Sequence, residues 1–157
     1  MAMIGSVLRS GVLAACAWTL SSCERAPAPL ALRTDDPALL VQGASLYAKH
    51  CAVCHGAHLE GQPRWRERDP ATGRMPAPPH DASGHTWHHP DQLLFDITKL
   101  GIAEAVKLKD YDSAMPAFGG TLSDAEIVAV LSWIKSQWPP EIRQHQAEVD
   151  AAARRDR

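Results

Sequence analysis

Apolar residues recur at helical spacing most clearly in the stretch that follows Ser123. Ser123 and Glu126 have the spacing of a capping box, in which each side chain binds the other residue's backbone N–H. Pro139 and Pro140 then mark an end, because proline cannot continue a helix. The apolar residues at i, i+3, i+4 and i+7 are Ile127, Val130, Leu131 and Ile134. The pattern predicts a helix from residue 124 to about residue 138 with one buried face.

Two earlier stretches have the same periodicity. Asp36 is a plausible helix cap with Pro37 at the first helical position, and Pro90 opens a second helix that ends at Gly101. The apolar or small positions are Leu39, Leu40, Gly43, Leu46 and Tyr47 in the first helix and Leu93, Leu94, Ile97 and Leu100 in the second. The connections at 56–84 and 101–120 are rich in glycine, proline and charge. We therefore predict one all-α domain over residues 36–138.

The N-terminal 22 residues are typical of an export signal. Arg9 supplies a positive charge, and an uncharged, largely apolar run follows at 10–22. The run is shorter than the roughly twenty apolar residues of a membrane-spanning helix. It ends in Leu-Ser-Ser-Cys23, which resembles a bacterial lipobox and implies cleavage before Cys23 and lipid attachment there. Cleavage before Cys16 would leave a shorter apolar core, and an ordinary signal with an incidental Cys23 stays open.

Two segments beside the domain lack apolar periodicity. Residues 23–35 combine prolines with alanine and other small residues, which is the composition of a flexible tether. Residues 139–157 are polar and mixed in charge, and we expect a frayed or disordered tail. The formal net charge of −2 comes without a basic block, so nucleic acid is not an expected partner.

The candidate chemistry lies just after the first predicted helix. Cys51, Cys54 and His55 form C-x-x-C-H, the attachment signature of a c-type haem: each thiol adds to one vinyl group, and the histidine binds the iron. A zinc site would need a second cysteine pair or two histidines at finger spacing, and neither follows. A thioredoxin-like redox pair would need alternating strands and helices around it. One such motif predicts one haem.

Around this motif the chain resembles the class I cytochromes c. The shared pattern is Gly43-x-x-x-Tyr47-x-x-x-Cys51-x-x-Cys54-His55-Gly56, followed by Met115-Pro116 before the last helix. The resemblance covers about residues 36–138. It implies an all-α class I cytochrome c fold in which the N- and C-terminal helices cross at Gly43, near Tyr47 and Trp133. It also implies one covalent haem c enclosed by loops.

The resemblance further implies two axial ligands. His55 would be the proximal ligand, oriented by a downstream proline carbonyl that accepts its ring N–H. Pro76, Pro78 and Pro79 are candidates for that proline, and the sequence does not distinguish them. Met115 would be the distal ligand. The alternatives are Met75, which also precedes proline, one of the histidines at 80–89, or an open site. Methionine with histidine raises the reduction potential, which suits electron transfer.

Two side-chain groups in the long loop remain open. His80, His85, His88 and His89 gather in the sequence around Trp87, and imidazole suits copper or zinc, although contacts with haem propionates or with water are the simpler interpretation. The residues that could bind a propionate are Arg64, Trp65, Arg66, Arg68 and Arg74.

These features predict a mono-haem one-electron carrier that is not itself an enzyme. We expect transient redox protein partners, no small-molecule substrate, and a lipid anchor on the periplasmic side of a bacterial membrane, or else a soluble periplasmic protein. One alternative is a haem subunit of an oxidase or dehydrogenase complex. Another is a haem or copper binding or sensing protein that uses residues 80–89.

Overall fold

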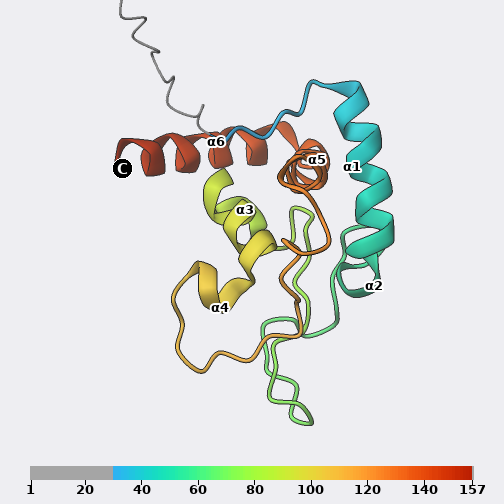
Figure 1. Cartoon of the computed structure of the whole chain (residues 1–157), viewed down its shortest axis with the longest axis vertical. Helices are drawn as coiled ribbons and strands as arrows, with labels where there is room; N and C mark the ends of the chain where they lie inside the picture. The colour runs from blue at the N-terminus through green and yellow to red at the C-terminus, as the bar shows by residue number, and fades with distance from the viewer. Residues whose placement is uncertain (1–29, 157) are drawn as a thin grey trace, which may run out of the picture.

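The computed structural model describes residues 30–156, and within them the secondary structure is entirely helical (Figure 1). The proposed export signal and Cys23 lie outside these residues. The helices are α1 (Pro37–His50), α2 (Ala52–His55), the 3-10 helix η1 (Thr86–His88), α3 (Asp91–Leu100), α4 (Ile102–Ala105), α5 (Asp124–Ser136) and α6 (Pro140–Arg155). The all-α prediction is confirmed, and α1, α3 and α5 are the three helices that the apolar periodicity predicted.

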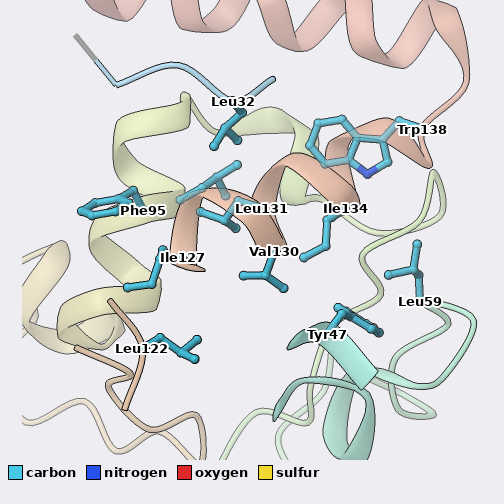
Figure 2. Packing of buried hydrophobic residues seen from close by; sticks show 11 residues of the cluster. Leu32, Tyr47, Leu59, Phe95, Leu122, Ile127, Val130, Leu131, Ile134 and Trp138 are labelled. Carbon is cyan, nitrogen blue, oxygen red and sulfur yellow. The ribbon is translucent and has the colours of Figure 1, made fainter. Parts of the chain in front are cut away.

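Helix α5 is the centre of the core. Its capping box forms as predicted, with Ser123 Oγ accepting from the Glu126 backbone N–H and the Glu126 carboxylate accepting from the Ser123 N–H. Figure 2 shows the buried side chains around it. The core residues are Leu32, Tyr47, Leu59, Leu94, Phe95, Leu122, Ile127, Val130, Leu131, Ile134 and Trp138. Burying one such large side chain contributes about 1.5–3 kcal/mol, so these residues are the main source of stability.

Helices α1 and α5 pack closely against each other, as the resemblance implies (Figure 1). A Cβ atom at Gly43 would collide with the backbone carbonyl of Ala129, so only glycine fits at this crossing. The ring of Tyr47 packs on the Trp133 indole with 4.7 Å between centroids. The crossing places the end of α1, and therefore the cysteine motif, against the core.

The C-terminal segment is not a disordered tail. Residues Pro140–Arg155 form α6, which runs across the top of the molecule in Figure 1, above α3. Its buried positions are Gln146 and Asp150, both polar, so the segment shows no apolar stripe in the sequence. They replace apolar packing with hydrogen bonds: Gln146 Nε2 donates to the Asp91 carboxylate at 2.8 Å, and the Asp150 carboxylate accepts the Asp91 backbone N–H at 3.0 Å.

The expected tether is also packed where it is described. Leu32 is buried, and its backbone N–H donates to the Asp91 carboxylate at 3.2 Å. The Leu30 carbonyl accepts from the Arg154 guanidinium at 2.7 Å, which joins this segment to α6. Lys135 Nζ completes the buried network with a 2.9 Å ion pair to Asp91. The packed structure therefore begins at least six residues before Asp36, because the buried Asp91 carboxylate and Arg154 hold the backbone of residues 30–32.

Within residues 30–156, none of the helices combines the length and the apolar character that crossing a membrane requires.

Candidate functional site

The cysteine motif lies at the junction of α1 and α2. Helix α1 ends at His50, and the backbone N–H groups of Cys54 and His55 both donate to the Cys51 carbonyl, so the motif forms one helical turn. The Tyr47 hydroxyl donates to the Gly56 carbonyl at 2.8 Å and holds the end of this turn against α1. This helical turn therefore fixes the positions of the two thiols and the imidazole relative to one another.

Both thiols are free, with Cys51 partly buried and Cys54 exposed. Burial raises the pKa of the Cys51 thiol to about 11, and the neighbouring Cys54 adds a smaller contribution. A redox-active C-x-x-C pair needs a lowered thiol pKa, since the thiolate is the reactive form. The Cys51 thiol therefore lacks the lowered pKa that marks the reactive member of a redox pair.

His55 is buried and has one nitrogen free for a metal. Its Nδ1 lies 2.8 Å from the Pro78 carbonyl, and because a carbonyl can only accept, Nδ1 carries the proton. Nε2 then has the lone pair that iron requires. Burial lowers the pKa of His55 and so favours the neutral ring, although the Pro78 hydrogen bond opposes this shift. The proline that the sequence could not identify is Pro78.

The loop that carries Pro78 is fastened at several points. The Leu59 carbonyl accepts the backbone N–H of His80 at 2.8 Å, and the His55 carbonyl accepts that of Gly61. A Cβ at Gly61 or at Gly84 would collide with the backbone of Pro79, so glycines pack on both sides of the proline pair. Residues 55–84, which we call the proximal region, thus hold the Pro78 carbonyl in place by backbone contacts.

Met115 lies in the connection between α4 and α5, which we call the distal region and define as residues 106–120. Its side chain is partly exposed, and its backbone N–H donates to Ser113 Oγ at 3.1 Å. After it, the Phe118 N–H donates to the Thr98 carbonyl at 2.9 Å, so the chain returns along the end of α3. Met75, the alternative ligand, is also partly exposed and lies in the proximal region.

The two regions meet at their tips. Arg74 Nε donates to the Asp112 carboxylate at 2.7 Å, and the Arg68 guanidinium lies 5.9 Å from the centre of the Tyr111 ring. The guanidinium of Arg66 covers the Trp65 indole at 4.0 Å. Four of the five candidate propionate-binding residues thus already contact protein groups, and the structure singles out none of them for a propionate.

The four loop histidines do not form one cluster. His80 points inward to His55, with 4.0 Å between ring centroids. His85 stacks on Trp65, and the exposed His88 stacks on Trp87 at 3.7 Å. Across the part of the chain that is described, no three His, Cys, Asp or Glu side chains are grouped to hold a metal ion. The copper alternative therefore has no preformed site in these residues.

The donor atoms present fit haem c. The imidazole Nε2 of His55 follows directly on two thiols within one helical turn, and imidazole and thioether are both established axial ligands of haem iron. Sequence reasoning missed that Pro78 is the accepting proline and that His80 contacts His55. No local signal distinguishes these residues, because three prolines and four histidines crowd the same loop.

The fold and the motif define a mono-haem c-type cytochrome. The family model described as cytochrome c oxidase, cbb3-type, subunit III matches residues 38–134, which is more than half of the chain, and the chain belongs to this family. The protein therefore binds one covalently attached haem c and carries electrons. Neither a curated protein nor a solved structure matches the chain.

Proposed function

We propose that haem c is attached through Cys51 and Cys54, and that His55 and Met115 are its axial ligands. The observation that carries this proposal is the hydrogen bond from His55 Nδ1 to the Pro78 carbonyl, which leaves Nε2 free beside the two thiols. Met115 is favoured over Met75 because it lies outside the loop that supports His55, in the separate connection that leads into α5.

The bound haem supplies an iron that exchanges one electron at a time. The chain's own residues orient the imidazole, exclude water from it and set the potential, since methionine with histidine ligation raises the reduction potential. Two protein ligands also leave no open position for a small molecule. The protein is then a one-electron carrier, not an enzyme by itself, and its docking with redox proteins is transient.

The carrier is held on the periplasmic side of a bacterial membrane by lipid on Cys23. The support is the sequence pattern that ends at Cys23, together with the haem motif, because c-type haem is attached in bacteria outside the cytoplasmic membrane. The several acyl chains of a bacterial lipoprotein, at about 0.8 kcal/mol per buried methylene, give firm anchoring.

A second candidate function is that of a haem subunit in an oxidase complex. The family description favours it, because that description names an oxidase subunit. Purification from native membranes in mild detergent distinguishes the two. A carrier elutes alone, whereas a subunit elutes with a stoichiometric catalytic partner.

Attachment is tested with a double variant that carries both Cys51→Ala and Cys54→Ala. It is produced, like the wild type, with the haem-attachment machinery. Haem staining after denaturing electrophoresis should be strong in the wild type and lost in the double variant. Covalent haem that survives in the double variant would contradict attachment at these cysteines.

Anchoring is tested by labelling cells with radioactive palmitate, with Cys23→Ser as the test variant and Cys16→Ser as the matched control. The first variant should lose the lipid label, and the second should keep it. A label that survives in Cys23→Ser, or is lost in Cys16→Ser, would contradict lipid attachment at Cys23.

A further inference from the structure

His80 covers one face of the imidazole that we assign to the iron. The ring centroids of His55 and His80 are 4.0 Å apart, and the ring planes are inclined by 35°. His80 follows the accepting proline by only two residues, so the same short segment contacts His55 at its Nδ1 and on its face. The face of the His55 ring is therefore covered by a flat, polar side chain and not by an aliphatic one.

The His80 ring is itself fixed by hydrogen bonds. The buried Thr86 hydroxyl lies 3.0 Å from His80 Nδ1 and 3.4 Å from the Pro79 carbonyl. A hydroxyl can donate and accept, so the His80 ring is hydrogen-bonded to Thr86 in either tautomer.

The backbone of His80 is held as well. Its N–H donates to the Leu59 carbonyl at 2.8 Å, and its carbonyl accepts the Trp138 indole N–H at 2.7 Å. The edge of Tyr47 lies against its ring, with 6.2 Å between centroids. His80 is therefore held by α1, by the segment after α5 and by its own loop. If the His55 ring rotated, the His80 ring could not rotate with it.

One hydrogen bond does not fix the plane of an axial imidazole. The bond from His55 Nδ1 to Pro78 acts at one edge of the ring, so it resists rotation of the ring about its Cβ–Cγ bond through a single contact. A flat group packed on the face of the ring blocks that motion. Groups that hold a metal-binding histidine in this way set its orientation and its basicity.

We propose that His80 is a positioning residue that fixes the plane of the His55 imidazole, and that it thereby tunes the electronic state of the haem iron. This rests on the proposed ligation of the iron by His55. The orientation of the axial imidazole plane decides how unpaired spin is shared among the four pyrroles of oxidised haem. The proton shifts of the four haem methyl groups report that distribution.

The test compares oxidised holoproteins by proton NMR and by redox titration. His80→Leu removes the ring, His80→Phe keeps a flat ring without Nδ1, and Thr86→Val keeps His80 but removes its hydrogen-bond partner. His145→Leu is the matched control, because His145 is an exposed histidine on α6 that contacts Trp87 and not His55.

We expect His80→Leu to change the order or spread of the methyl shifts and to shift the reduction potential. Thr86→Val should change them less, His80→Phe should return them towards the wild-type pattern, and His145→Leu should match the wild type. A loss of packing alone would lower thermal stability without reordering the methyl shifts, which separates positioning from a structural role.

The wild-type methyl pattern and potential in His80→Leu would overturn the proposal. If His80→Leu fails to hold haem, Thr86→Val becomes the test variant. Wild-type haem methyl shifts in Thr86→Val would then overturn the proposal. Failure of the underlying ligand assignment looks different, because the wild-type protein itself would then lack the low-spin spectrum of histidine ligation.

Discussion

The proximal and distal regions supply one proposed ligand each, yet the protein holds them very differently. In the proximal region His55, Leu59, Pro79 and Gly84 are buried. Backbone hydrogen bonds tie the loop to itself, and the Tyr47 hydroxyl of α1 donates to its Gly56 carbonyl. In the distal region no residue from 106 to 120 is buried, and Met115 has one side-chain hydrogen bond to its backbone. Both segments are loops, so the difference does not come from secondary structure.

The comparison shows which half of the site the fold builds by itself. The imidazole is oriented by protein contacts, so its geometry is a property of the folded chain. The Met115 thioether belongs to a loop in which no residue is buried, so its position would rely on the proposed bond to iron. We therefore expect the proximal region to respond to substitution mainly through stability and the distal region mainly through ligation.

The largest difference is expected from two glycines. Gly84→Ala places a Cβ against the Pro79 carbonyl, whereas a Cβ at Gly120 meets nothing within 4 Å. Overpacking of this kind costs about 1–3 kcal/mol, and an open surface position changes stability by at most about 0.5 kcal/mol. Urea unfolding of the two holoproteins measures both values. Equal losses would contradict the contrast between the regions.

A smaller effect is expected from Tyr47→Phe. The substitution removes the hydroxyl that donates to the Gly56 carbonyl and leaves that carbonyl with only the longer, 3.3 Å bond from the Leu59 backbone N–H. A typical hydrogen bond contributes about 0.5–1.5 kcal/mol net, and we expect a loss in this range because the carbonyl keeps one partner. The free energy of unfolding should fall while the visible spectrum is unchanged. A changed spectrum at wild-type stability would show that Tyr47 acts on ligation instead.

Ser113→Ala should have the opposite signature. It removes the hydrogen bond to the Met115 backbone, which is worth about 0.5–1.5 kcal/mol at most sites and less where water can replace it. We expect little change in the unfolding free energy but faster binding of carbon monoxide to the reduced protein, because the methionine leaves the iron more often. Wild-type binding kinetics would mean that the loop is held by other contacts.

The smallest effect is expected from Arg74→Gln. The ion pair with Asp112 joins the tips of the two regions, but both side chains are largely exposed, and such pairs contribute little in water. The melting temperature should be unchanged within error at physiological salt. A clear decrease, abolished by high salt, would show that the two regions stabilise each other.

Much of the fold was predictable because local signals agreed with the tertiary structure. The i, i+3, i+4 spacing after Ser123 predicted α5 and its buried face, and Pro37 after Asp36 predicted the start of α1. Gly43 could be identified only through the family resemblance. Its need for glycine arises from the Ala129 carbonyl, which is distant in sequence.

Helix α6 could not be predicted, for a physical reason. Its buried face carries Gln146 and Asp150, whose burial depends on a network with Asp91, and no periodicity of apolar residues reveals it. The same network holds Leu32, so the segment before α1 looked like a tether. Polar burial depends on partners that are far apart in the chain, and composition therefore gave the wrong expectation at both ends.

The candidate site shows the same division. The cysteine motif is local and was evident at once, whereas Pro78 had to be distinguished from Pro76 and Pro79 by the path of the loop. His80 lies in the same short segment as three other histidines. It differs from them in that its side chain points inward and contacts His55, which the sequence does not reveal.

The most direct test of the account is the visible spectrum of the oxidised holoprotein, read at the weak sulfur-to-iron band near its red end. The account predicts this band in the wild type and in the control Met75→Ala, and its loss in Met115→Ala together with new binding of carbon monoxide to the reduced form. A band that survives in Met115→Ala, or one that disappears in Met75→Ala, would contradict the assignment of the distal ligand and the closed electron carrier built on it.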